Sequence, residues 1–125
     1  MASVIRAVSR QEYSPSVLSL LIVDDDSWMR EACKSVAEKM GFVAQTVDSA
    51  VGALMQLASF PANVVLLDLA QGETETLQLV ARIKRLQPCA ELIIVGSQGK
   101  SEVPAPALKS SAFEFLRKPF NTEDF

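Results

Sequence analysis

Short apolar runs alternate along the chain with segments whose apolar residues recur every three or four positions. The runs predict five strands, over residues 17–23, 42–47, 64–67, 92–95 and 112–116. The segments between the first four runs have helical spacing, near residues 29–40, 50–58 and 77–86. Strands that alternate with helices are typical of right-handed βαβ units around a parallel sheet, so the pattern predicts an α/β fold with one doubly wound sheet.

The helical spacing also predicts which side chains each helix buries. In the first helix these are Met29, Ala32, Cys33, Val36, Ala37 and Met40; in the second, Ala53, Leu54, Leu57 and Ala58; in the third, Leu77, Leu79, Val80, Ala81, Ile83 and Leu86. Asp26 or Ser27 is predicted to cap the first helix, and Gly41 to end it. Asp48 and Ser49 offer a cap for the second helix, and Pro88 stops the third.

Two stretches do not follow this alternation. Residues 1–16 are interpreted as an N-terminal extension, and residues 17–125 as a single domain. The segment 97–111 is ambiguous, because Pro104 and Pro106 would damage the interior of a helix. No repeat, linker or low-complexity segment divides the chain further.

Charge and composition exclude several classes of function. The 125 residues contain 12 Lys and Arg against 15 Asp and Glu, a net charge of −3, and no His. A chain without His has no His-based metal site, no Ser-His or Cys-His catalytic pair and no phosphohistidine of its own. The acidic balance argues against a broad basic face for nucleic acid, so we expect no direct nucleic-acid contact.

The cysteines and the longest apolar runs bear on the compartment. Cys33 and Cys89 lie far apart and lack the spacing of zinc ligands, so both are predicted to be small core residues in a reducing compartment. The apolar runs are far shorter than the roughly 20 residues that cross a membrane, and no signal-peptide core follows the N-terminus. We therefore expect a cytoplasmic protein without a membrane partner.

Polar residues follow four of the predicted strands. Asp24, Asp25 and Asp26 follow the first strand, Asp68 the third, Gly96 and Ser97 the fourth, and Lys118 the fifth. In open α/β sheets, chemistry is found at the carboxyl ends of the strands. Clustered carboxylates suit Mg²⁺, and a nearby Lys would pair with a phosphoryl group. One of these Asp residues could therefore be a nucleophile that accepts a phosphoryl group. Taken alone, three Asp after a strand are equally typical of a helix cap.

Three segments together resemble the receiver domain of two-component response regulators. They read LIVDDDS over 21–27 with Arg30 shortly after, VVLLDL over 64–69, and AFEFLRKPF over 112–120, and the resemblance covers residues 18–120. It implies a flavodoxin-like sheet of five parallel strands in the doubly wound order 2-1-3-4-5. The triple Asp followed by Ser resembles receivers joined to σ54-dependent activator modules.

The resemblance also implies roles for individual residues. Asp68 would accept the phosphoryl group from a sensor histidine kinase, a phosphotransfer protein or a small phosphodonor, and Lys118 would pair with the phosphoryl oxygens. Mg²⁺ would be held by Asp24, Asp25, Asp68 and the backbone carbonyl of Ala70. Phe115 would change rotamer on activation, and Asp26 would cap the helix instead of binding metal. An output domain or a homodimer partner would receive the signal.

The chain departs from the family pattern in its switch region. The family has Ser or Thr at the position of Gly96, and the neighbouring Ser97 would substitute only if the loop shifts. The segment 70–76 lacks the usual Met-Pro and Asp-Gly. Only 125 − 118 = 7 residues follow Lys118, so the fifth helix is expected to be truncated or missing. The chain would then be an excerpt of a longer protein, or residues 1–16 or another chain would cover that face.

Other functions remain open at this stage. The departures support one alternative, a degenerate receiver that acts as an interaction module without phosphorylation. Asp24, Asp25, Asp68 and Lys118 are all present, however, and they favour the phospho-acceptor receiver. The spacing Asp24-Asp25-Asp26 also occurs in haloacid-dehalogenase-like phosphohydrolases, although Trp28 stands where those enzymes have Thr or Val. A flavodoxin-like flavin site fits less well, because three Asp would repel a phosphate after the first strand.

Overall fold

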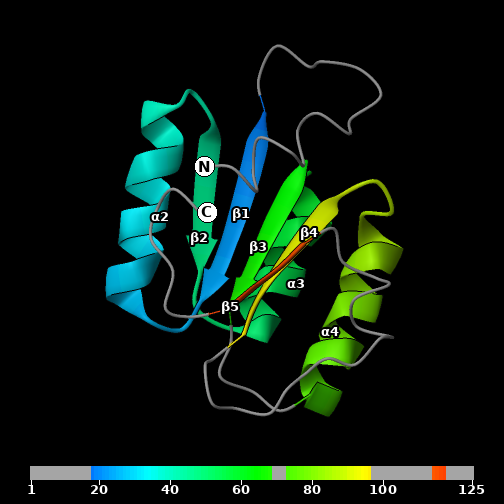
Figure 1. The fold of residues 1–125 in the computed structure, drawn as a ribbon. Helices are drawn as coiled ribbons and strands as arrows, with labels where there is room; N and C mark the ends of the chain where they lie inside the picture. Colours follow the sequence, from blue (N-terminus) through cyan, green and yellow to red (C-terminus); the bar gives the residue numbers. More distant parts are fainter. Residues whose placement is uncertain (1–17, 69–72, 97–113, 118–125) are drawn as a thin grey trace.

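The chain forms a single parallel sheet with helices on both faces (Figure 1). The computed structural model describes residues 18–68, 73–96 and 114–117. Its elements are β1 Ser19–Asp24, α2 Ser27–Lys39, β2 Val43–Val47, α3 Ala50–Ser59, β3 Val64–Asp68, α4 Glu73–Leu86, β4 Glu91–Gly96 and β5 Glu114–Arg117. Each strand that the apolar runs predicted is therefore present, within two residues at the boundaries that are described.

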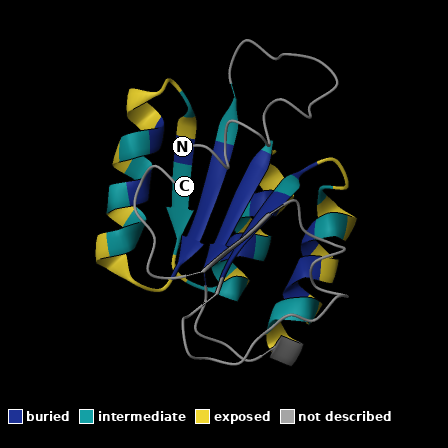
Figure 2. Cartoon of the chain, viewed as in Figure 1, coloured by how far each residue is buried: buried dark blue, intermediate teal, exposed yellow. Residues whose placement is uncertain are grey.

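The strands lie in the order β2-β1-β3-β4-β5 and all neighbours are parallel. The predicted order 2-1-3-4-5 is thus confirmed. From Leu20 to Val23 and from Val64 to Leu67 every residue of β1 and β3 is buried, as expected for central strands covered on both faces (Figure 2). Because the strands are parallel, all five carboxyl ends meet at one edge of the sheet.

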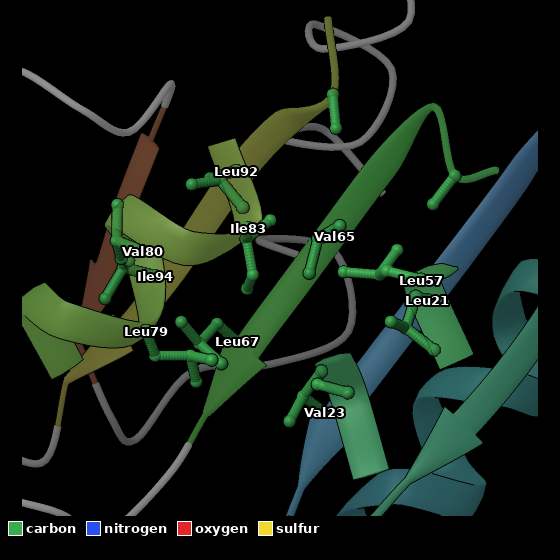
Figure 3. Close-up of a cluster of buried hydrophobic side chains, with 13 residues drawn as sticks. Leu21, Val23, Leu57, Val65, Leu67, Leu79, Val80, Ile83, Leu92 and Ile94 are labelled. Atoms are coloured by element: carbon green, nitrogen blue, oxygen red, sulfur yellow. The ribbon is translucent and has the colours of Figure 1, made fainter. Parts of the chain in front are cut away.

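Alternate residues of the central strands supply two separate cores. On one face, Leu21, Val23, Val65 and Leu67 pack in a cluster with residues of α3 and α4, among them Leu57 and Ile83 (Figure 3). On the other face, the alternate positions of β1 and β3 pack with Cys33 and Ala37 of α2. Cys33 is thus a core residue as predicted, whereas the prediction is wrong for Cys89, which is exposed because it lies in the turn between α4 and β4. The alternation of side chains along a strand therefore assigns each strand residue to the α2 face or to the α3–α4 face.

The helix ends follow their predicted capping residues. The Asp26 side chain accepts hydrogen bonds from the backbone N–H groups of Trp28 and Met29, and the Ser49 side chain accepts one from Gly52. Gly41 has a φ of 95°, a left-handed conformation that glycine adopts without steric cost, and it lies just beyond the C-cap of α2. Local sequence thus determines where α2 and α3 begin and where α2 ends.

Four side chains that the helical spacing predicted to be buried are exposed in the structure. Ala58 and Ala81 are exposed, and so are Met40 and Leu86 at the ends of their helices, by 52% and 45%. Successive helical residues are rotated by about 100°, so Ala58 lies about 140° around the helix from the buried Ala53. A helix on a flat sheet buries only a narrow stripe, which is why the flanking positions remain in solvent.

Several expectations concern residues outside the described part of the chain. These are the N-terminal extension 1–16, the ambiguous segment 97–111 and the truncated fifth helix after Lys118. Among the described residues, no helix has both the length and the apolar character needed to cross a membrane.

Candidate functional site

Two aspartates end adjacent strands at the same level of the sheet. Asp24 is the last residue of β1 and Asp68 the last of β3, and the two are paired in the ladder between these strands. Neighbouring strands lie about 4.8 Å apart. Side chains two positions apart on a strand lie on the same face of the sheet. Because Ile22 and Leu66 pack in the core on the α2 side, both carboxylates lie on the α2 face. The fold therefore brings together two acids that are 44 residues apart in the sequence.

Both carboxylates are buried, which is the unusual feature of this edge. Asp24 is 1% exposed and Asp68 5%, and they are the only buried polar or charged residues in the part of the chain that the structure describes. Oδ2 of each residue is itself a buried atom. Placing an ionised carboxylate away from water costs several kcal/mol, and placing two side by side adds their repulsion. A purely structural role does not explain this arrangement.

The connection between β1 and α2 is held by hydrogen bonds that converge on Asp24. Its Oδ1 accepts a hydrogen bond of 2.9 Å from the backbone N–H of Asp26. Its backbone carbonyl accepts one of 2.8 Å from Nη1 of Arg30. Asp26 points the other way and caps α2, as predicted, through its Oδ1. Asp25 lies between these contacts and is exposed.

The donor set at this edge fits a hard divalent cation. Asp24 and Asp68 supply buried carboxylate oxygens, and Asp25 supplies a further carboxylate at the surface. Within the described residues, no group of three or more His, Cys, Asp or Glu side chains is arranged so that it could hold a metal ion. Mg²⁺ does not require one, because it commonly binds through one or two carboxylates and keeps several waters. A bound cation would also relieve the repulsion between the two buried acids.

The other predicted site residues are located only in part. Gly96 is the last residue of β4 and pairs with Arg117, so it lies at the same edge as Asp68. Phe115 lies in β5, opposite Ile94. Lys118 follows the last residue of β5 directly in the sequence. The structure of Lys118, Ala70 and Ser97 lies outside the described residues.

Arg30 has a contact at this site that the sequence does not predict. The spacing of six residues between Asp24 and Arg30 was the available signal, because it returns a long side chain from the first turn of α2 to the end of the strand. The contact involves a backbone carbonyl, and such a contact leaves no pattern of complementary side chains in the sequence.

Comparison with known proteins gives a consistent result. The sequence pattern of the family described as response regulator receiver domain matches residues 20–125. The nitrogen assimilation regulatory protein NtrX of Azorhizobium caulinodans is 33% identical over 106 residues, which is 83% of this chain and 23% of that protein. The chemotaxis protein CheY of Listeria monocytogenes is 29% identical over 108 residues, 86% of this chain and 91% of that protein.

A solved structure supports the fold. A response regulator protein from Burkholderia pseudomallei, whose crystal structure contains a phosphorylated aspartic acid, a calcium ion and citrate, is similar with a TM-score of 0.73 and 24% identity. The match covers 86% of this chain and 63% of that one. The chain spans 23% of the length of the NtrX-type relatives that it matches. These matches do not favour the phosphohydrolase or the interaction-only alternative.

Proposed function

Because this chain belongs to the response regulator receiver domain family, we propose that Asp68 is the residue that accepts the phosphoryl group. The observation that supports this choice is the pairing of Asp68 with Asp24, with both side chains buried at the carboxyl edge of the sheet. Asp25 and Asp26 are exposed, and Asp26 is engaged as a helix cap. Asp68 is thus the acid on the central strand β3 that lies beside the proposed cation site.

The proposed chemistry is a phosphoryl transfer in which Asp68 is the nucleophile. A carboxylate oxygen of Asp68 bonds to phosphorus while the bond from phosphorus to the donor breaks, and the donor atom leaves with the electron pair. A bound divalent ion, Mg²⁺ in our proposal, would neutralise the phosphoryl oxygens, with Asp24, Asp25, Asp68 and the carbonyl of Ala70 as its ligands. Transfer of this kind depends mainly on positioning and charge neutralisation.

Lys118 is proposed to add a second positive charge to the same edge. It follows Arg117, which ends β5 and pairs with Gly96 at the end of β4. Its ammonium group would pair with a phosphoryl oxygen on Asp68, as a point charge that needs no fixed geometry. Gly96, Ser97 and Phe115 are proposed to form the switch region, in which Gly96 has no side chain with which to donate a hydrogen bond.

Receiver domains are signalling modules and not conventional enzymes. We propose that a sensor histidine kinase or phosphotransfer protein phosphorylates this chain in the cytoplasm, and that an output domain or a second copy responds. The NtrX-type relatives are more than four times as long as the matched region, which supports an attached output domain in this protein as a proposal. The recipient must bind the phosphorylated and unphosphorylated states with different affinities for signalling to occur.

The test is intact-protein mass spectrometry after incubation with acetyl phosphate and Mg²⁺. The wild type is expected to gain one phosphoryl adduct, and Asp68→Asn is expected to gain none. Asp26→Asn is the matched control, because it removes a negative charge from the same edge, keeps a good cap and should label like the wild type.

Two outcomes would contradict the proposal. Full labelling of Asp68→Asn would show that another residue is the acceptor. The acceptor function itself would be rejected if wild-type protein, shown to be folded by circular dichroism, gained no adduct with acetyl phosphate and none with a histidine kinase as donor.

A further inference from the structure

We propose that Arg30 is a positioning residue that holds the connection between β1 and α2 in the shape required for divalent-ion binding. The inference rests on the proposed function, because it concerns the same ion site. It differs from the roles assigned above, since Arg30 carries a positive charge and cannot itself be a ligand of a cation.

Arg30 binds the connection at both ends. Its Nη1 donates a hydrogen bond of 2.8 Å to the carbonyl of Asp24, and its backbone N–H donates one of 2.9 Å to the carbonyl of Asp26. The backbone bond is the first helical bond of α2 and forms with any side chain, whereas the bond to Asp24 requires the guanidinium. The side chain is half-buried and not extended into solvent. One residue of α2 therefore brackets Asp25 from both sides, and it fixes the path of the backbone where the acidic side chains emerge.

The same bracket orients the buried carboxylate of Asp24. The backbone N–H of Asp26 donates to Asp24 Oδ1 at 2.9 Å, so the position of Asp26 sets the rotation of that carboxylate. The guanidinium of Arg30 holds the Asp24 carbonyl on one side of this contact, and the first helical hydrogen bond of α2 holds the Asp26 carbonyl on the other. A hydrogen bond from a guanidinium to a carbonyl is charge-assisted and therefore strong for its kind. Loss of the Arg30 side chain should let the Asp24–Asp26 segment adopt more conformations.

Positioning and simple electrostatics predict opposite signs for the loss of Arg30. A positive charge next to a cation site repels the ion, so by Coulomb's law its removal should tighten ion binding. A positioning residue preorganises the ligands, so its removal should weaken binding. Residues that orient metal ligands typically contribute tenfold or more to metal affinity. The direction of the change therefore decides between the two roles.

The experiment is a titration of the full chain with Mn²⁺, followed by the electron paramagnetic resonance signal of the free ion, and then competition with Mg²⁺. Arg30→Met keeps the aliphatic part of the side chain and removes the charge and the donors. We expect its dissociation constant for Mn²⁺ to be roughly tenfold higher than that of the wild type. Arg82→Met is the control, because Arg82 is exposed on α4, on the opposite face, and its removal should leave the affinity unchanged.

A second variant and an ion-free measurement exclude an indirect effect on folding. Arg30→Gln is also uncharged but keeps a hydrogen-bond donor on a shorter side chain. Its affinity for Mn²⁺ should therefore not exceed that of the wild type. Without any ion, the backbone amide of Asp26 should exchange with solvent faster in Arg30→Met than in the wild type, because its acceptor on Asp24 is less well placed. The amides of β3 should be unaffected if the fold is intact.

The outcomes separate this inference from the proposed function. Tighter or unchanged Mn²⁺ binding in folded Arg30→Met would overturn the positioning role, while labelling of Asp68 in the wild type would leave the acceptor function standing. If the wild type binds neither Mn²⁺ nor Mg²⁺, the ion site and the role of Arg30 both fail. Weaker binding together with faster exchange at Asp26 would support the inference.

Discussion

The amino and carboxyl edges of the sheet differ in the polar groups that they bring together. At the amino edge, Ser19 and Asn63 bond to each other: the Ser19 N–H donates to Asn63 Oδ1 at 2.9 Å, and the Asn63 N–H donates to the Ser19 carbonyl at 3.0 Å. At the carboxyl edge, Asp24 and Asp68 place two acids of the same charge side by side. The first arrangement satisfies neutral groups, whereas the second accumulates charge that a stable fold does not need.

The amino edge has the contacts of a structural junction. The Asn63 carbonyl accepts a hydrogen bond of 3.0 Å from the N–H of Glu91, and the Ser19 hydroxyl donates to the carbonyl of Pro61 at 2.8 Å. Asn63 thus connects the beginnings of β1, β3 and β4. The contrast teaches that neutral polar groups bonded to one another make a structural junction, whereas two buried acids of like charge at the end of adjacent strands mark a candidate site.

The largest effect on stability is expected from Asn63→Ala. The substitution removes the acceptor of a part-buried backbone N–H, and a group left in this state costs about 1–3 kcal/mol. The free energy of unfolding in urea should fall by about 2 kcal/mol, with phosphorylation by acetyl phosphate unchanged. Asn63→Asp keeps the Oδ1 acceptor and should lose less. Equal losses in both variants would contradict the role of this hydrogen bond.

At the carboxyl edge, Asp68→Asn is expected to change stability in the opposite direction. Without divalent ions at neutral pH, neutralising one of two adjacent buried carboxylates removes their repulsion, so the free energy of unfolding should rise by about 1–2 kcal/mol. Addition of Mg²⁺ should stabilise the wild type more than the variant. Asp26→Asn, at an exposed cap, should change little. If the free energy of unfolding of Asp68→Asn were lower than that of the wild type, the two carboxylate charges would stabilise this edge, which would contradict the argument.

The next prediction concerns the amino edge and depends on one backbone angle, the φ of Gly41. Its φ of 95° is unfavourable for residues with a Cβ, so Gly41→Ala should lower the free energy of unfolding by about 1 kcal/mol. No atom lies within 4 Å of a Cβ added there, so the loss would come from the backbone alone. Gly41→Asn should lose less, because Asn tolerates this region better. Thermal unfolding would compare the three proteins, and equal stability of Ala and Gly would refute the argument.

The smallest effect is expected from Gly96→Thr at the carboxyl edge, and it concerns the response to phosphorylation. A threonine would provide the hydroxyl donor that this position lacks, at the end of β4 beside β3. The difference in hydrogen exchange between phosphorylated and unphosphorylated protein should then increase in peptides from β4. Gly96→Ala is the control, since it adds a Cβ without a donor. An equal difference in the Thr and Ala variants would reject a role for the hydroxyl.

Much of the fold could be predicted because its signals are local. Apolar runs located the strands, helical spacing located α2, α3 and α4, and Asp26, Ser49 and Gly41 marked helix ends that the structure confirms. The strand order came from the family resemblance and not from periodicity, which carries no information about neighbours. The faces of the helices were predicted too widely at Ala58 and Ala81, because a period of 3.6 specifies a direction but not the width of the contact.

Spacing, capping and residue type act over a few positions, so they were enough to predict the elements, the fold class and the acids available to the carboxyl edge. Three features became visible only in the folded chain: Asp24 and Asp68 are register partners, both are buried, and Arg30 reaches the Asp24 carbonyl. Burial and register depend on the packing of strands that are distant in the sequence. The contact of Arg30 joins a side chain to a backbone carbonyl, which every residue has, so the six-residue spacing from Asp24 permits this contact but does not single it out.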